Sequence, residues 1–155
     1  MSVQILLFLH IVGACVLLGT GAGIAFFMVV SNRSRDPALI AHTAGIVVLA
    51  DTVFTATAAA VQPVTGALLA REIGWPLGQG WVLASLGLYV FVGLFWLPVV
   101  AMQIRLRRLA AEARDAGLPL PPAYHRLYRM WFAFGFPAFA AVLAIVWLMI
   151  AKPDI

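Results

Sequence analysis

The chain has 155 residues, of which 64% are hydrophobic and only 10% are charged, and its mean hydropathy is +1.03. Soluble domains cover their core with roughly 25% charged residues, so this composition excludes an ordinary soluble domain and predicts an integral membrane protein embedded in a lipid bilayer. The net charge of +4 does not indicate nucleic-acid binding, because the charges lie in short patches between apolar runs and form no soluble basic face.

Four apolar stretches are long enough to cross a bilayer, which takes about 20 residues of helix. The first is not a cleavable signal peptide, because MSVQ has no basic residue and the apolar run that follows is too long for one. The sequence therefore predicts an all-α fold, a four-transmembrane-helix bundle within a single membrane domain of residues 1–155. The predicted helices cover 3–30, 38–70, 80–104 and 125–151.

The arginines predict the orientation of the bundle. The first loop contains Arg33 and Arg35 and the segment 105–129 contains six arginines, whereas the opposite side has only Arg71 and Lys152. Basic loops stay on the cytoplasmic side during insertion, so both termini are expected on the periplasmic side of a bacterial inner membrane.

Glycine and proline positions predict how the helices pack. Gly19 and Gly23 are four residues apart, the spacing that lets two membrane helices pack closely, and we therefore expect a homodimer. Pro63 and Pro137 are expected to kink the second and fourth helices and to free backbone carbonyls inside the bundle. Cys15 is the only cysteine, which excludes an internal disulfide and a cysteine zinc site.

Ionisable residues inside membrane helices are costly, and each is therefore a candidate for function. By helical rise, His10 lies about 20 Å from His42 in depth, so these two histidines cannot bind the same haem iron. His10 is expected to share the outer half of the membrane with Thr55 and Ser85. His42 is expected near the cytoplasmic surface together with His125.

The second helix has a line of polar residues. Asp51, Thr55 and Gln62 fall within about 20 to 40° of one line, as a proton or polar path would require. Asp51 is nine residues from His42, which places the two on opposite faces, so its partner must come from another helix. Without such roles, the histidines could simply hydrogen-bond across helices or face the headgroups.

The whole chain resembles the bacterial family of domain of unknown function 2269, predicted integral membrane proteins of about this length. The resemblance rests on LHIVGA, RSRDPALIAHTAGIVVLAD, QPVTGALLAREIGWP, WLPVVAMQIRLRRLA, PPAYHRLYRMWFA and the closing AKP. That family implies a membrane protein and no chemistry.

A second resemblance does imply chemistry. LHI followed by glycines, PVTG, and HRLYRMW with a terminal KP resemble HemJ-type protoporphyrinogen oxidases, which are related in pattern to copper-resistance D and cytochrome-b561-like bundles. That resemblance implies that His10 serves a haem-b or porphyrin site. The HemJ type also has a lysine in the third helix, and WVLASLGLYV has none, so the resemblance does not extend to porphyrinogen oxidation.

Two hypotheses of different classes follow. The first is a small haem-b membrane protein with a redox or porphyrin-handling role, in which His10 is the axial ligand, with His42 or His125 as alternatives, and electrons pass to a quinone or a redox partner. The second is a cofactor-free protein, either a permease for a small solute or an accessory subunit of a membrane complex. The sequence leaves open whether the protein is an enzyme.

Overall fold

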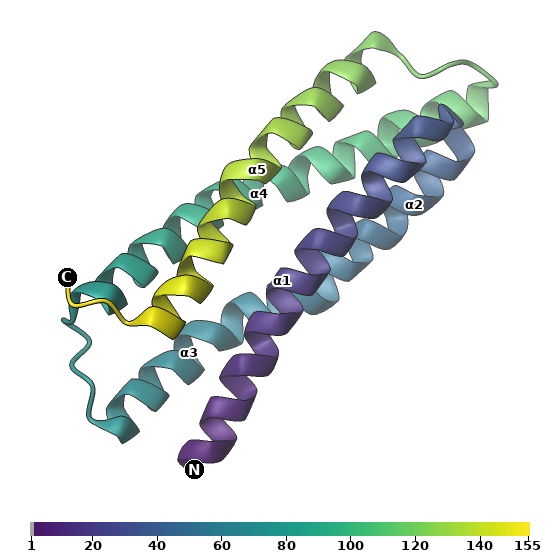
Figure 1. The fold of residues 1–155 in the computed structure, drawn as a ribbon. Helices are drawn as coiled ribbons and strands as arrows, with labels where there is room; N and C mark the ends of the chain where they lie inside the picture. Colours follow the sequence, from purple (N-terminus) through teal and green to yellow (C-terminus); the bar gives the residue numbers. More distant parts are fainter. Residues whose placement is uncertain (1) are drawn as a thin grey trace.

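In a computed structural model, which describes residues 2–155, the chain folds into long helices that run up and down in one bundle (Figure 1). Four helical units are long and apolar enough to cross a membrane, and the described residues contain no strand, so the predicted all-α four-helix membrane fold is confirmed. The units are α1 (Val3–Ser34); α2 (Pro37–Ala50) continued by the π-helical segment η1 (Asp51–Thr55) and α3 (Ala56–Ile73); α4 (Gly80–Ala116); and α5 (Pro122–Ala151).

Short loops at the two ends of the bundle separate these units. The Asp36 side chain caps the start of α2, because its Oδ1 accepts a hydrogen bond from the Ala38 N–H at 2.8 Å. Pro37 occupies the first turn of α2, where the helix has no use for the N–H that proline lacks. Gly74 and Gly117 adopt positive φ angles of 81° and 63° where α3 and α4 end. We call the end with both termini the terminal end and the opposite, arginine-rich end the basic end (Figure 1).

The apolar core lies toward the basic end. There α1, α2, α4 and α5 meet around fully buried side chains that include Ile40, Leu106 and Tyr124. Toward the terminal end the bundle divides into two pairs, because α3 packs on α1 while α4 packs on α5 (Figure 1).

The outer surface of the bundle is strongly apolar. Phe8, Leu97 and Trp147 are each more than 60% exposed, on three different helices. Contiguous apolar surface of this kind is rare on soluble monomers, whereas lipid covers it without cost. The exposed surface thus agrees with the membrane assignment made from composition.

One polar contact joins the two pairs in the terminal half. Pro63 lies inside α3 and has no N–H, so the carbonyl of Ala59, four residues earlier, has no helical donor. The hydroxyl of Tyr89 on α4 donates a hydrogen bond to that carbonyl. The predicted release of a carbonyl by Pro63 thus has a specific partner on another helix.

Replacing Tyr89 with phenylalanine is expected to lower the free energy of unfolding by about 1–3 kcal/mol, because it leaves a partly buried carbonyl unpaired. The measurement is chemical unfolding of the detergent-purified protein. The control is Tyr89→Phe in a Pro63→Ala background, where the alanine supplies the missing N–H to the Ala59 carbonyl. In that background Tyr89→Phe should lower the free energy of unfolding by less than about 0.5 kcal/mol. Equal losses in both backgrounds would show that Tyr89 acts only through packing.

Candidate functional site

The buried side of η1 and α3 is polar over most of its length. Its positions recur every three or four residues, as one face of a helix requires, and each is at most 9% exposed. From residue 51 to residue 65 this face is about 21 Å long, at 1.5 Å per residue. Between residues 51 and 65 four of the five buried positions are polar, and we call these four the polar face: Asp51, Thr55, Gln62 and Thr65, with Ala58 as the apolar member.

At the terminal end of the polar face, His10 of α1 joins it. The His10 Nδ1 lies 3.0 Å from the Thr65 hydroxyl oxygen, which is also 3.0 Å from the Val61 carbonyl and 3.1 Å from the Gln62 carbonyl. A threonine hydroxyl has one proton, and Thr65 donates it to its own helix. We infer that the His10 Nδ1 is the protonated nitrogen that donates to Thr65, which leaves the Nε2 lone pair available.

Two glycines make room for this contact. A Cβ at Gly66 would lie 3.0 Å from the His10 Cε1, so the imidazole packs directly on the α3 backbone. A Cβ at Gly13 would lie 2.7 Å from the Gln62 side-chain oxygen, so the amide packs directly on α1. α1 thus places His10 against Gly66 of α3, and α3 places Gln62 against Gly13 of α1. A larger residue at either glycine would require the facing side chain to shift.

Asp51 lies at the opposite end of the polar face, in the π-helical segment. The Ala56 N–H donates to the Asp51 carbonyl, five residues back, which is the wide turn that defines η1. The side chain of Asp51 is 3% exposed and accepts a 3.4 Å hydrogen bond from Trp96 Nε1 of α4. Within residues 2–155 no basic side chain forms an ion pair with this carboxyl. π-Helical turns occur frequently at functional sites.

Between these ends, two buried oxygens have no partner. Thr55 Oγ1 and Gln62 Oε1 are fully enclosed and make no hydrogen bond to the part of the chain that the structure describes. An unpaired buried polar group costs about 1–3 kcal/mol, so such atoms are usually paired with water or a ligand. Thr55 and Gln62 are therefore the two members of the polar face whose side-chain oxygens have unused hydrogen-bonding capacity.

The family model for predicted integral membrane proteins, DUF2269, matches residues 4–153. The chain belongs to this family. The match includes all four membrane units and therefore the whole polar face. No curated protein and no solved structure matches the chain. The family described in the sequence analysis is thus confirmed, and the similarity to the HemJ type stays a prediction.

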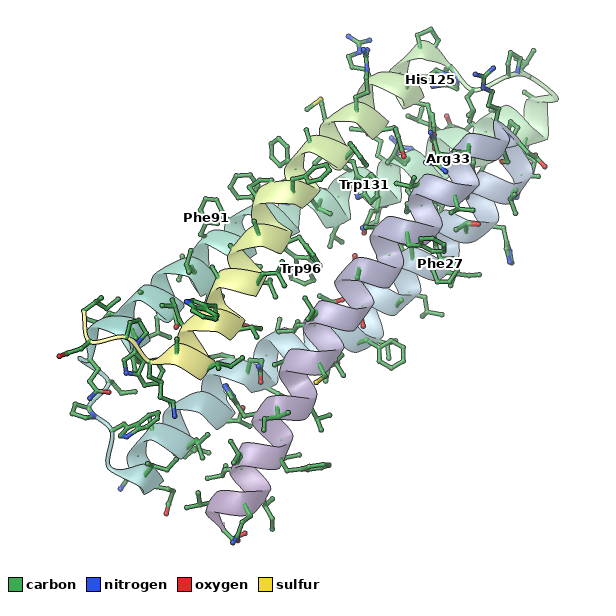
Figure 2. All side chains as sticks on the ribbon, in the orientation of Figure 1. Phe27, Arg33, Phe91, Trp96, His125 and Trp131 are labelled. Carbon is green, nitrogen blue, oxygen red and sulfur yellow. The ribbon has the colours of Figure 1, made fainter. Side chains whose placement is uncertain are left out.

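The other two histidines of this DUF2269 protein lie far along the bundle from His10, toward the basic end. His42 is exposed on α2, where it lines a groove against α4 to which His125 does not contribute. His125 is exposed near the start of α5, with its ring edge-on to Tyr124 at 5.6 Å (Figure 2). Residues 2–155 contain no cluster of three or more His, Cys, Asp or Glu side chains that could hold a metal.

The expectation that His10 shares the outer half of the membrane with Thr55 and Ser85 stays a prediction, but neither of these residues hydrogen-bonds to His10. Its partner is Thr65, ten residues farther along the chain, and the Ser85 hydroxyl donates to the Trp81 carbonyl at 2.7 Å. The first helix is longer than expected: α1 continues to Ser34 rather than residue 30, which places His10 about 6 Å farther from the basic end of that helix.

The residues that sequence reasoning missed are those that complete each contact from a second helix. The place of Thr65 on the same helical face could have been predicted, since it continues the spacing of Thr55 and Gln62, but its pairing with His10 could not. Trp96 offered no such signal, because an indole in a membrane helix is ordinarily a packing or interface residue.

Proposed function

We propose that this protein is a small permease that moves protons, alone or together with a small solute, along the polar face. The observation that supports the proposal most directly is the pair of unpartnered oxygens, Thr55 Oγ1 and Gln62 Oε1, enclosed between Asp51 and His10. Two groups able to exchange protons thus stand at the ends of a buried row of hydrogen-bonding atoms. Chains of Asp, Glu and His inside membrane helices are the usual construction of proton relays.

The chemistry of each position fits such a path. The Asp51 carboxyl can take up and release a proton, and the Nε2 lone pair of His10 can accept one. Thr55 and Gln62 cannot store a proton, but they can hydrogen-bond water between these two groups. The face extends for about 21 Å, roughly two thirds of the 30 Å hydrocarbon core, so the path covers most of the barrier.

The experiment is proton flux into proteoliposomes that contain a trapped pH-sensitive dye, driven by a potassium diffusion potential. Vesicles with the wild-type protein are expected to acidify faster than protein-free vesicles of the same lipid composition. Wild-type vesicles that acidify no faster, both alone and with a panel of small solutes, would contradict the proposal. The variant that identifies the path is Asp51→Asn.

A haem-b site at His10 is the second candidate, and the inferred tautomer of His10 favours it. A ligating histidine usually donates its other ring N–H to a nearby oxygen, and Thr65 fills that role here. His10 would supply one axial nitrogen, Nε2, and the haem would supply one-electron chemistry. His42 and His125 cannot complete the ligand set because they lie toward the basic end, so the residues fit one axial ligand and not a pair.

The haem candidate predicts a b-type absorption spectrum, with about one haem per chain in a pyridine haemochromogen assay. His10→Ala is expected to remove the Soret band and to reduce bound haem at least about tenfold, since a single axial ligand is lost. His125→Ala is the matched control and should retain the spectrum. A protein that purifies colourless and stays so after haem is added would reject this candidate and leave the permease proposal intact.

A further inference from the structure

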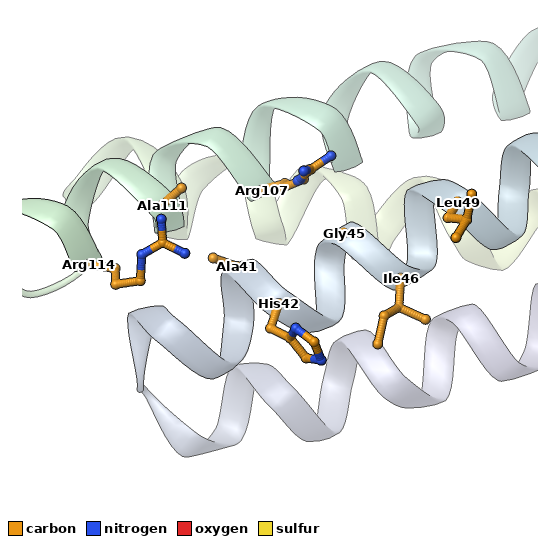
Figure 3. Close-up of a pocket in the computed structure, with 8 residues that line it drawn as sticks. All are labelled: Ala41, His42, Gly45, Ile46, Leu49, Arg107, Ala111 and Arg114. Carbon is orange, nitrogen blue, oxygen red and sulfur yellow. The ribbon is translucent and has the colours of Figure 1, made fainter.

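A groove at the basic end is separate from the polar face. It runs between α2 and α4 and has a volume of about 390 Å³ (Figure 3). The polar face plays no part in this groove, because none of its residues contributes to the lining. The lining residues are Ala41, His42, Gly45, Ile46 and Leu49 of α2 and Arg107, Ala111 and Arg114 of α4.

The polar lining of this groove is positively charged. Arg107 and Arg114 extend from α4, and the imidazole of His42 lies on α2 (Figure 3). Arg114 is paired with Asp115 at 2.7 Å, whereas Arg107 forms no ion pair with any residue in the described range 2–155. No acidic side chain lines the groove, so Arg107 provides an uncompensated positive charge.

The side chain that carries that charge packs against the backbone of α2. A Cβ at Gly45 would lie 3.5 Å from the Nε and 3.8 Å from the Cζ of Arg107, so the guanidinium lies directly over the glycine. A larger residue at 45 would occupy the space beside the guanidinium. The planar fork of an arginine binds phosphate oxygens through two parallel hydrogen bonds, which makes it the side chain best suited to a phosphate group.

The rest of the groove is apolar and points away from the basic end. Ile46 and Leu49 follow His42 along α2 by one and two turns, and they are 55% and 63% exposed. Since α2 continues from there into the membrane-spanning unit, these side chains extend the groove from the charged end toward the bilayer interior. A free anion would use only the charged part of this surface.

We propose that the groove binds an anionic phospholipid, with its headgroup phosphate at Arg107 and an acyl chain along Ile46 and Leu49. Three observations support this: Arg107 forms no ion pair within residues 2–155, its guanidinium packs on Gly45 of α2, and exposed apolar side chains lie beside that glycine on α2. Basic pockets between membrane helices are recurrent binding sites for anionic headgroups. The proposal does not depend on what the polar face conducts.

The test is native mass spectrometry of the protein released from nanodiscs that contain equal amounts of phosphatidylcholine and phosphatidylglycerol. The wild-type protein is expected to retain one phosphatidylglycerol per chain and little phosphatidylcholine. Arg107→Gln should weaken retention about tenfold, the loss expected for one charge-assisted contact. Arg108→Gln is the matched control, because Arg108 is exposed, lies outside the groove and faces Glu112 at 3.7 Å.

A second variant tests the shape of the groove without changing its charge. Gly45→Leu fills the space beside the guanidinium and is expected to reduce phosphatidylglycerol retention as Arg107→Gln does, while thermal unfolding shows that both variants are folded. Equal retention of the two lipids by the wild type, or equal losses in the Arg107 and Arg108 variants, would overturn the proposal. Retention of phosphatidylglycerol that millimolar inorganic phosphate abolishes would instead assign the groove to free phosphate.

Discussion

Asp51→Asn protein in proteoliposomes is expected to conduct protons at least about tenfold more slowly than the wild type, equivalent to a barrier raised by about 1.4 kcal/mol. The amide matches the carboxyl in shape, and its oxygen can still accept the hydrogen bond from Trp96 Nε1. What it loses is the ability to bind and release a proton. The variant therefore separates proton exchange from the structural part of the contact, and its unfolding midpoint should stay close to that of the wild type.

The matched control for this variant is Thr52→Val, one residue away in the same π-helical segment. Thr52 is exposed, and its hydroxyl is already donated to the Val48 carbonyl at 2.8 Å, so it lies outside the polar face. Its flux should equal that of the wild type, whereas Asp51→Glu should restore part of the activity lost in Asp51→Asn. If Asp51→Asn conducts as fast as the wild type, protons do not pass through Asp51.

Gly66→Leu is expected to lower the free energy of unfolding by about 1–3 kcal/mol and to reduce proton flux, because the new side chain occupies the space of the His10 imidazole. Even a Cβ at this position would lie 3.0 Å from the His10 Cε1, and the further carbons of leucine would displace the ring from Thr65. The stability is measured by chemical unfolding in detergent, and the flux by the dye assay in proteoliposomes.

Gly87→Leu provides the comparison for Gly66→Leu. Gly87 lies in α4 and is exposed, and a Cβ added to it would have no heavy atom of another side chain or helix within 4 Å. This variant should change the free energy of unfolding by less than about 0.5 kcal/mol, as surface substitutions usually do. A Gly66→Leu protein with normal stability and normal flux would show that the contact of His10 with α3 has no functional role.

The sequence predicted the fold because the bilayer imposes simple rules. In lipid, a spanning segment must satisfy its backbone hydrogen bonds internally, which a helix does. Long apolar runs separated by charged patches therefore form membrane-spanning helices. The same logic predicted that Pro63 frees a carbonyl, since a proline removes one specific N–H. The shared buried face of Asp51, Thr55 and Gln62 likewise depends on helical periodicity, which the π-helical turn at Asp51 changes too little to disrupt.

The partners of these residues were not predictable in the same way. Thr65 for His10, Trp96 for Asp51 and Tyr89 for the freed carbonyl each come from a different helix than the group they contact. Which residues meet depends on the height, rotation and tilt of one helix against another. Those quantities result from the packing of whole surfaces, and no local pattern in the chain records them.

By itself, the sequence determined that the protein spans the membrane with four helices and that its polar residues fall on particular helical faces. Both properties follow from hydropathy and from a fixed rise and rotation per residue, which act within one helix. Only the tertiary structure decided that His10 packs on Gly66 and pairs with Thr65. It also decided that Arg107 lies over Gly45, because contacts between helices depend on how complete side-chain surfaces fit together.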